Sequence, residues 1–265
     1  MKKYLVIGNP ISHSLSPKLH NHWFKINKID AIYEKKQIKE SDIKEIISNL
    51  RNEKIHGVNV TVPFKQSVIP FMDELSLEAK EVNSVNTIYK EKNKIIGHNT
   101  DIVGFELAIR AKGYDIKNKN IFILGAGGVV PSIISSLKKL KVNKIILSNR
   151  TRKRAENLKK IFTTLEVVDW GTTPDFDMII NATSLGLNNS DIIDLDYIKI
   201  GSNKIFYDVI YNPKQTNFLE RAKQTGNKFE NGKMMFIYQA HQSFTIWNKV
   251  MPKIDDETIK MLDND

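Results

Sequence analysis

The segment that decides the fold is NIFILGAGGVVPS, Asn120–Ser132. Its first part, Asn120–Gly125, is a short apolar run that is typical of a buried strand. The turn that follows consists of Gly125, Ala126, Gly127, Gly128 and Val129, and a helix starts directly after it. Glycines let the backbone approach a pyrophosphate, and the N–H groups of a helix start favour its charge. The segment therefore predicts a dinucleotide-binding domain, although Val130 replaces the third glycine of the strict motif.

Two arginines near the end of the next strand bear on the choice of dinucleotide. That strand, KIILSN, ends at Asn149, and Arg150, Thr151 and Arg154 follow. Domains that bind NAD carry an acidic residue at this place, and this sequence has none. The planar forks of Arg150 and Arg154 suit a 2′-phosphate, so we predict NADP. A solvated basic helix start is the alternative, but cations in a first turn oppose the helix dipole unless an anion offsets them.

Outward from this segment, short apolar runs alternate with helical patterns in both directions. Upstream, we predict strands at Tyr4–Gly8, Ala31–Ile38 and His56–Pro63, helices capped by Ser16 and by Ser41 or Asp42, and a hairpin of Ser84–Lys90 with Asn93–Thr100. Downstream, we predict helices at Ile102–Lys112, Ile133–Leu140, Arg154–Phe162 and Lys233–Met251 and strands at Lys144–Asn149, Glu166–Trp170, Phe176–Thr183 and Lys204–Tyr211. This alternation predicts an α/β fold with mostly parallel sheets.

The length of the chain favours two domains. With 265 residues it is long for one domain, and the strand-helix alternation restarts after Gly113. We predict an N-terminal α/β domain at residues 1–101, with a mostly parallel sheet, and a C-terminal Rossmann-like domain at residues 102–235. The last stretch, residues 236–265, is predicted to complete the N-terminal domain.

Composition limits the classes of function. The chain has no cysteine, which excludes disulfides, thiolate nucleophiles and sulfur-ligated metals, and we predict a reducing, cytoplasmic location and no metal site. No apolar run approaches the roughly 20 residues of a membrane span, so no membrane partner is expected. The net charge of +10 leaves nucleic-acid binding as an alternative. The basic residues are scattered and form no recognised motif, so we predict no nucleic-acid partner.

Polar residues at strand ends mark a second candidate site. In NVTVPFK, the side chains of Asn59 and Thr61 are expected on one face of the strand, and Val58, Val60 and Val62 on the other. Lys65 follows the carboxyl end of the strand, where ligands bind in open α/β sheets, and could polarise a carbonyl or transfer a proton. Further polar clusters stand at Ser12–Pro17, Asn86–Thr87 and Asn99–Asp101. Ordinary caps and turns are the alternative explanation for each cluster.

Together these motifs resemble the NADP-dependent shikimate dehydrogenases of the shikimate/quinate dehydrogenase family. In chain order they are SHSLSP, NVTVPFK, SVNTI, HNTD, GAGG, NRT, NATS, DVIYNPxxT from Asp208 to Thr216, and Gln239-Ala240. The resemblance spans roughly Ser12 to Gln242. It implies an oxidoreductase that reversibly reduces 3-dehydroshikimate to shikimate with NADPH, in the chorismate pathway of aromatic amino-acid synthesis. Residues 1–101 would then bind the substrate and residues 102–235 the cofactor.

The resemblance also implies roles for individual residues. Lys65 and Asp101 match the catalytic pair. The substrate-binding residues would be Ser14, Ser16 and Tyr211 at the carboxylate, and Asn59, Thr61, Asn86 and Gln239, with Asp101, around the ring hydroxyls. The cofactor-binding residues would be Gly125, Ala126, Gly127, Gly128, Val129, Asn149, Arg150, Thr151, Arg154, Thr183, Val209 and Gly232. The sequence departs from many relatives at Val209, where they have methionine.

Three alternatives remain open from the sequence. The first is a quinate/shikimate dehydrogenase that uses NAD, against which Arg150 and Arg154 count. The second is a non-catalytic sensor that binds a nucleotide or shikimate, which would tolerate loss of Lys65 or Asp101. The third is nucleic-acid binding through the net charge. The expected partners are the small-molecule substrate and a second copy of the chain in a homodimer.

Overall fold

The structure, a computed structural model, describes residues 1–188 and 190–263. The chain divides into two compact units, which are described separately. The first consists of Met1–Gly104 and Ile237–Asp265, and the second of Phe105–Phe236. Asn264 and Asp265, the end of the predicted segment 236–265, lie outside the described residues. Within the described ranges, no helix has both the length and the apolar character that crossing a membrane requires.

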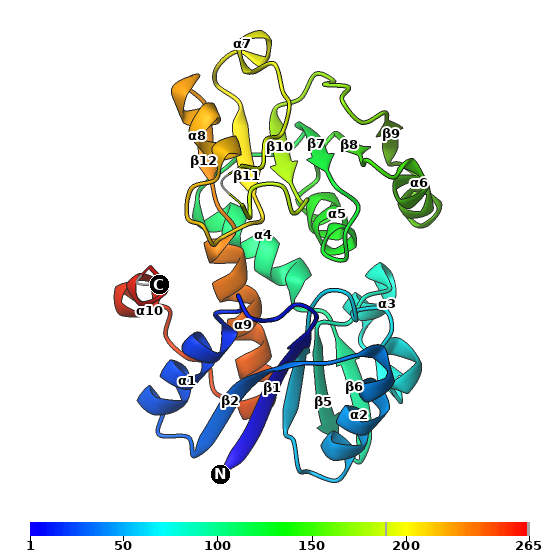
Figure 1. Cartoon of the computed structure of the whole chain (residues 1–265), viewed down its shortest axis with the longest axis vertical. Coiled ribbons are helices and arrows are strands. Elements are labelled where there is room, and N and C mark those ends of the chain that lie inside the picture. Colours follow the sequence, from blue (N-terminus) through cyan, green and yellow to red (C-terminus); the bar gives the residue numbers. More distant parts are fainter. Residues whose placement is uncertain (189, 264–265) are drawn as a thin grey trace. The chain divides into compact units, whose positions relative to one another are not determined.

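The first unit contains a six-stranded sheet with the order β2-β1-β3-β5-β6-β4 (Figure 1). Its strands are β1 (Lys2–Gly8), β2 (Ala31–Gln37), β3 (Gly57–Val60), β4 (Glu74–Leu75), β5 (Thr87–Glu91) and β6 (Lys94–His98). The pairs of β1 with β2 and with β3 are parallel, whereas β5 and β6 form the predicted antiparallel hairpin. The two-residue strand β4 was not predicted, because it is too short to show a period of two.

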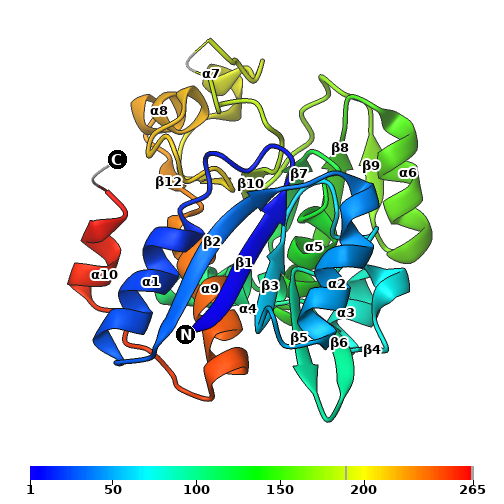
Figure 2. The same ribbon diagram turned by 60° about the horizontal axis from the view of Figure 1, so that its bottom comes forward.

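Helices cover both faces of this sheet (Figure 2). They are α1 (Ser16–Ile26), α2 (Ile43–Arg51), α3 (Leu77–Val82) and the last part of α9 (Lys233–Asn248), whereas α10 (Asp256–Met261) lies beside α1 (Figures 1 and 2). Leu5 of β1 lies in an apolar cluster with the buried face of α2. Its neighbour Tyr4 points to the other face, where its ring lies 5.2 Å from Phe24 of α1 and 5.1 Å from Trp247 of α9. Side-chain alternation along β1 therefore separates an α2 face from an α1 and α9 face.

Two predicted helix starts were wrong in detail. Ser16 is the first residue of α1 instead of its N-cap, and Leu15 holds the cap position without a side-chain hydrogen bond. A 3₁₀ turn, Glu40–Asp42, precedes α2, and no side chain caps α2. The carboxylate of Asp42 instead accepts a hydrogen bond from the backbone N–H of Lys39, 2.8 Å away, so it is used before the helix begins.

The strand before Lys65 is shorter than predicted. It ends at Val60, three residues before Pro63. Val58 and Val60 are buried as expected, but the side chain of Val62 is 56% exposed. The chain turns at Thr61, where the backbone oxygen accepts a hydrogen bond from Phe64, so the alternation of faces does not continue to Val62.

The second unit contains a fully parallel six-stranded sheet with the order β12-β11-β10-β7-β8-β9. Its strands are β7 (Asn120–Leu124), β8 (Lys144–Ser148), β9 (Glu166–Val168), β10 (Met178–Asn181), β11 (Ile205–Asp208) and β12 (Lys228–Glu230). This is the doubly wound order of dinucleotide-binding domains, in which the chain reverses direction across the sheet between β7 and β10. The predicted two-part α/β fold with a Rossmann-like domain is confirmed.

Helices also cover both faces of the second sheet. They are α4 (Asp101–Ala111), of which the part from Phe105 belongs to this unit, α5 (Val130–Lys139), α6 (Arg152–Ile161), α7 (Tyr197–Ile200) and α8 (Asn217–Gln224). Phe206 of β11 packs with Phe218 of α8 in one apolar cluster. The next residue, Tyr207, faces the other way and meets Phe105 of α4 edge-on at 5.2 Å. The short elements α7, α8 and β12 were missed in the sequence analysis.

Candidate functional site

Lys65 and Asp101 form a buried ion pair in the first unit. Lys65 lies in the turn after β3, and its ammonium donates to Oδ2 of Asp101 at 2.6 Å. Asp101 is the first residue of α4, where the helix dipole favours a negative charge. Oδ1 of Asn99 accepts hydrogen bonds from the backbone N–H groups of Asp101 and Ile102, which holds the helix start in place. The turn and the helix start thus bring together two residues far apart in the sequence.

Asn86 occupies the other side of the Asp101 carboxylate. Its Nδ2 donates to Oδ1 of Asp101 at 2.8 Å and to the hydroxyl of Thr100 at 3.0 Å. Its Oδ1 accepts from the backbone N–H of Thr100 at 2.8 Å. The two carboxylate oxygens are therefore divided between an amide and an ammonium. This extra hydrogen bond offsets part of the cost of burying an ion pair.

Asn59 lies on the α9 face of the sheet, on the strand before Lys65. Its Oδ1 accepts a hydrogen bond from the hydroxyl of Tyr33 at 2.7 Å, and its Nδ2 donates to the backbone oxygen of Asn86 at 3.0 Å. The ring of Tyr33 stacks on that of His20, with centroids 4.3 Å apart. Burial lowers the pKa of His20 to about 3, so this ring is neutral. Asn59 is thus held by neighbours on both sides, and its carbonyl keeps one lone pair for a further donor.

The other predicted substrate residues of the first unit are placed separately. The Ser14 hydroxyl accepts from the backbone N–H of Ser16 at 3.3 Å and donates to its hydroxyl at 3.2 Å, just where α1 begins. The methyl group of Thr61 lies so close to Gly8 that a Cβ there would be 2.5 Å from it. Gln239 is half-buried in α9.

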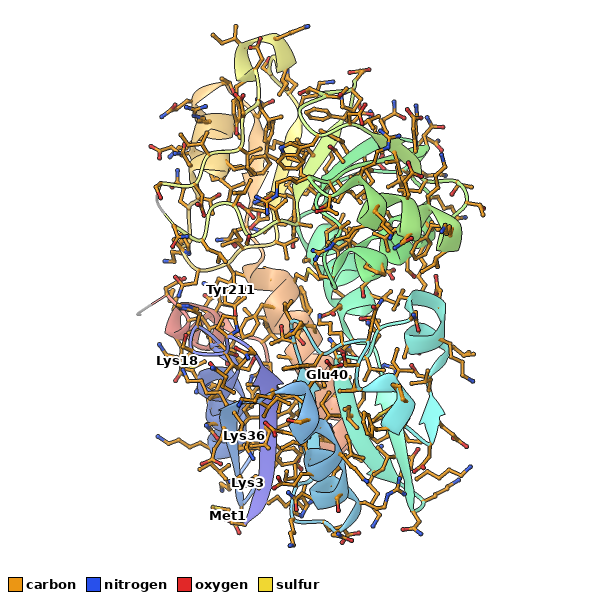
Figure 3. The ribbon with its side chains drawn as sticks, turned by 45° about the vertical axis from the view of Figure 1, so that its right-hand side comes forward. Met1, Lys3, Lys18, Lys36, Glu40 and Tyr211 are labelled. Carbon is orange, nitrogen blue, oxygen red and sulfur yellow. The ribbon has the colours of Figure 1, made fainter. Side chains whose placement is uncertain are left out.

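Tyr211 belongs to the second unit and is labelled in Figure 3. Its ring stacks on that of Phe236, with centroids 4.6 Å apart. The structure therefore brings together Lys65, Asp101, Asn86 and Asn59 within the first unit and pairs Ser14 with Ser16. Tyr211 is placed only within its own unit, where Phe236 is its aromatic neighbour.

The glycine turn of the second unit follows β7, at the point where the strand order reverses. Gly125 has a φ of +108°, and a Cβ there would lie 2.7 Å from the backbone oxygen of Ala182. It would also lie 3.1 Å from the methyl group of Thr183, so the loops after β7 and β10 touch. At Gly127, by contrast, the nearest atom would be 3.8 Å from a Cβ. Gly125 is required by the fold, whereas the small size of Gly127 leaves open space.

The start of α5 suits an anion. Val129 holds its N-cap position, and no side chain caps the helix. Gly127 and Gly128 are exposed and Ala126 is half-buried, so the backbone of the turn is accessible. An uncapped helix start beside accessible glycines fits a pyrophosphate, which N–H groups and the helix dipole bind. The residues present therefore fit a dinucleotide at the place where doubly wound sheets bind one.

The basic start of α6 contains arginines of two kinds. Arg152 pairs with the carboxylates of Asp169 and Glu156. Arg150 and Arg154 are exposed, and neither makes an ion pair within the described residues. The side-chain amide of Asn149 donates to the backbone oxygen of Thr151 at 2.8 Å and shapes the turn that carries Arg150. Of the three arginines Arg150, Arg152 and Arg154, the two that form no ion pair in the described part of the chain are those predicted to bind a phosphate.

Val209 and Gly232 adjoin in the second unit. A Cβ on Gly232 would collide with the carbonyl group of Val209, and the Gly232 N–H donates to the backbone oxygen of Ile210 at 3.1 Å. Beside them, Asp208 is fully buried at the end of β11 and accepts hydrogen bonds from Thr216 and from the backbone N–H of Ile210. Burial raises the pKa of Asp208 to about 6, although these hydrogen bonds act in the opposite direction.

Four buried residues beside Asn59 and Asn86 had no role predicted from the sequence. They are Tyr33, Thr87, Thr100 and Ser243. The threonines were visible as polar residues at strand ends. Tyr33 and Ser243 come from β2 and α9, and only packing brings those elements to β3. In the described part of the chain, no three His, Asp or Glu side chains gather as a metal site would require.

Comparisons with known proteins agree across both units. A family model described as the shikimate dehydrogenase substrate binding domain matches residues 6–88. A second, described as shikimate / quinate 5-dehydrogenase, matches residues 106–196. The chain is 60% identical over 262 residues to the shikimate dehydrogenase (NADP(+)) of Pelagibacter ubique (strain HTCC1062), and the match covers 99% of each chain.

Solved structures show the same relationship over the whole length. The shikimate dehydrogenase of Aquifex aeolicus is 34% identical with a TM-score of 0.90, and the match covers 100% of this chain and 98% of that one. The shikimate 5-dehydrogenase of Thermus thermophilus, in complex with NADP(H) and shikimate, is 29% identical with a TM-score of 0.88. That match covers 98% of this chain and 97% of the other. The chain therefore belongs to the shikimate dehydrogenase family.

Proposed function

We infer that this chain is an NADP-dependent oxidoreductase that reversibly reduces 3-dehydroshikimate to shikimate, and we propose Lys65 and Asp101 as its catalytic pair. The observation that carries the proposal is the buried ion pair between them, 2.6 Å long, in a chain that is 60% identical to a shikimate dehydrogenase. The first unit would bind the substrate and the second the cofactor. The boundaries proposed for these functional domains are residues 1–101 and 102–235, with residues 236–265 completing the first.

In the proposed reaction, Lys65 stabilises the negative charge that develops on the substrate oxygen. NADPH, when bound, supplies a hydride to the carbonyl carbon. The carbonyl oxygen then becomes an alkoxide, and the Lys65 ammonium stabilises it and donates a proton, which yields the alcohol. In the reverse direction the neutral lysine would accept that proton.

Asp101 and Asn86 orient this lysine and the substrate. The Asp101 carboxylate accepts from Lys65 with one oxygen and from Asn86 with the other, so its position is fixed from two sides. A remaining lone pair on Asp101 could accept a hydrogen bond from a ring hydroxyl of the substrate. The carbonyl oxygen of Asn59 would likewise accept a hydrogen bond from a ring hydroxyl of the substrate. Fixed acceptors of this kind reject analogues that lack the hydroxyl, because the buried group would then be left unpaired.

The remaining substrate contacts are proposed from the family resemblance and the chemistry of the side chains. Ser14 and Ser16 would donate to the substrate carboxylate together with Tyr211. The hydrogen bond that Ser14 donates to Ser16 holds the two hydroxyls side by side, and the Ser14 proton would turn to the carboxylate when substrate binds. Thr61 and Gln239 would complete the hydrogen bonds to the ring hydroxyls. Neutral donors suffice for a carboxylate when several converge on it.

The second unit would hold NADPH through its turn and its arginines. The residues Gly125, Ala126, Gly127, Gly128 and Val129 would face the pyrophosphate, and Asn149, Arg150, Thr151 and Arg154 the adenosine 2′-phosphate. Thr183, Val209 and Gly232 would lie near the nicotinamide. The support is the uncapped start of α5 and the absence of ion pairs at Arg150 and Arg154 within the described residues.

One assay tests the proposal directly. Purified protein is incubated with shikimate or quinate, each with NADP or NAD, and reduced cofactor is followed at 340 nm. Rapid reduction of NADP with shikimate is expected. Turnover only with quinate and NAD would support the alternative dehydrogenase, and binding of shikimate without any turnover would support the sensor. A cytoplasmic location and a homodimer belong to the proposal as well, and light scattering after gel filtration measures the second.

A further inference from the structure

Ser243 of α9 lies at the centre of a buried hydrogen-bond network under the proposed substrate residues. Its side chain is fully buried. Its hydroxyl oxygen lies 3.0 Å from Nδ2 of Asn59, 2.8 Å from the hydroxyl of Thr87 and 3.3 Å from that of Thr100. The Thr87 hydroxyl in turn lies 3.0 Å from Oδ1 of Asn86. Ser243 thus contacts three members of the network that joins the two asparagines, in which Nδ2 of Asn59 also lies 3.1 Å from the Thr87 hydroxyl itself.

The number of amide and hydroxyl protons limits which group donates in each hydrogen bond of this network. Asn86 uses both Nδ2 hydrogens on Thr100 and Asp101, and its Oδ1 accepts from the Thr100 N–H. The hydroxyls of Thr87 and Thr100 lie 3.0 Å and 3.2 Å from Oδ1, and we assign its second lone pair to the nearer one, that of Thr87. Having given its proton away, Thr87 can only accept, and of its two neighbouring donors Ser243 is nearer at 2.8 Å than Nδ2 of Asn59 at 3.1 Å. We therefore assign the Ser243 proton to Thr87 rather than to the backbone oxygen of Gln239, 3.1 Å away. The Ser243 oxygen keeps two lone pairs, which accept from Asn59 and from Thr100. Every donor and acceptor in the set is satisfied in this arrangement.

We propose that Ser243 is a positioning residue, which completes the hydrogen bonds of Thr87 and Thr100 beside Asn86 and so helps to hold the Asn86 amide against the Asp101 carboxylate that Lys65 contacts. The reversed Asn86 amide would present its oxygen to the carboxylate and its NH₂ group to the Thr100 N–H, and both contacts would be repulsive. Without the Ser243 hydroxyl, Asn59, Thr87 and Thr100 each lose one partner. Asn59 would then donate to Thr87, 3.1 Å away, and the Thr100 hydroxyl would compete with Thr87 for Oδ1 of Asn86, so the hydrogen bonds around Asn86 would change. α9 therefore contributes to the order of a site built mainly on β3, β5 and α4.

The inference rests on the proposed function for its kinetic readout. In Ser243→Ala, we expect kcat for shikimate oxidation to fall about tenfold and the primary isotope effect with shikimate deuterated at the carbon that loses hydride to increase, because hydride transfer becomes slower. The KM for NADP should remain within about twofold. Thr87→Val, which removes the hydroxyl and keeps the shape, should behave in the same way, whereas Thr87→Ser should keep most of the activity. The effects of Ser243→Ala and Thr87→Val should not add, because both break one network.

Thr245→Ala is the matched control on the same helix. The Thr245 hydroxyl donates to the backbone oxygen of His241 four residues earlier, as that of Ser243 can to Gln239, but it has no contact with the network. If Ser243 has only a structural role, Ser243→Ala will lower the melting temperature as Thr245→Ala does, with kcat and the isotope effect unchanged. That result would overturn the inference and leave the proposed function intact.

A measurement that needs no activity separates the two proposals. The side-chain amide protons of Asn59 and Asn86 can be followed by NMR hydrogen exchange in the ¹⁵N-labelled protein. We expect exchange at least about tenfold faster in Ser243→Ala than in the parent or in Thr245→Ala. Unchanged exchange would contradict the network, even if the parent fails to oxidise shikimate. Failure of the parent in the assay would overturn the proposed function alone.

Discussion

Lys65 and Asp101 are joined by a 2.6 Å ion pair although their side chains are only 10% and 8% exposed. Opposite charges removed from water to this extent need further hydrogen bonds to offset their desolvation. Asn86 provides one to the second oxygen of Asp101. The protein itself therefore orders the lysine on which the proposed chemistry depends.

Replacing Lys65 should affect turnover far more than binding. In Lys65→Ala, we expect kcat to fall by at least about a hundredfold, the usual contribution of a general acid, with KM for shikimate within a few-fold. Lys65→Arg keeps a positive charge for Asp101 but donates a proton poorly, so it should also be nearly inactive while remaining folded. Steady-state kinetics and thermal unfolding measure both effects. Turnover of either variant close to that of the parent would show that Lys65 has another role.

Arg150 should discriminate between the two nicotinamide dinucleotides. Loss of a charged hydrogen bond worth about 1.5–3 kcal/mol predicts that Arg150→Ala raises the KM for NADPH by about ten- to a hundredfold. The KM for NADH, which has no 2′-phosphate, should change little. Arg152→Ala is the control, because Arg152 already pairs with Asp169 and Glu156. Equal losses for both cofactors in Arg150→Ala would contradict the assignment.

Two glycines of the same turn should fail in different ways when replaced by alanine. Gly125→Ala places a side chain at a φ of +108° and against the Ala182 oxygen. We therefore expect the free energy of unfolding to fall by at least about 1–3 kcal/mol. Gly127→Ala meets open space and should keep the parent's melting temperature. It should nevertheless weaken NADPH binding if its backbone approaches the pyrophosphate. Chemical denaturation and cofactor titration distinguish these outcomes, and normal NADPH binding by Gly127→Ala would count against the proposed contact.

The buried carboxylate of Asp208 should make the protein less stable as pH rises, the opposite of the usual effect of a carboxylate. Burial raises its pKa from 3.8 to about 6 in the folded chain, so the folded state binds the proton more tightly than the unfolded state. This contribution to stability is complete below the unfolded pKa and is lost as pH rises through about 6. At about 1.36 kcal/mol per pKa unit, the change amounts to about 3 kcal/mol.

The variant Asp208→Asn isolates this titration. It cannot ionise, so its free energy of unfolding relative to that of the parent should rise by up to about 3 kcal/mol between about pH 4 and pH 7. Urea unfolding of both proteins across this range gives the difference. A difference that stays constant with pH would show that Asp208 does not titrate there.

Local patterns explain why much of the site could be predicted from sequence. The glycine turn has a composition that few other structures need, and Lys65 lies in the turn after a strand whose carboxyl end is the usual ligand position. The hairpin that leads to Asp101 consists of two short apolar runs separated by a turn rich in Lys, Glu and Asn. These features depend on neighbours within a few residues, and sequence patterns report such neighbours well.

Other features depend on contacts that no local pattern contains. Ser243 looks like an ordinary polar residue in a helix until α9 packs on the sheet and buries it. Val62 continues an alternating pattern, but the turn at Thr61 ends the strand first. Asp42 looks like a helix cap, but its carboxylate is already bound to the Lys39 N–H. In each case a competing contact decides the outcome.

The first unit is built from two segments that lie far apart in the sequence, and this affects how it folds during synthesis on the ribosome. Its segment Met1–Gly104 emerges first, but Ser243 and Trp247, which contact β3 and β5, emerge only after the whole of Phe105–Phe236. The apolar face that Tyr4 and Phe24 present to α9 therefore stays uncovered while more than a hundred further residues are translated. Because domains fold as they emerge, the second unit can finish before the first, and the oldest part of the nascent chain is the part most in need of a chaperone.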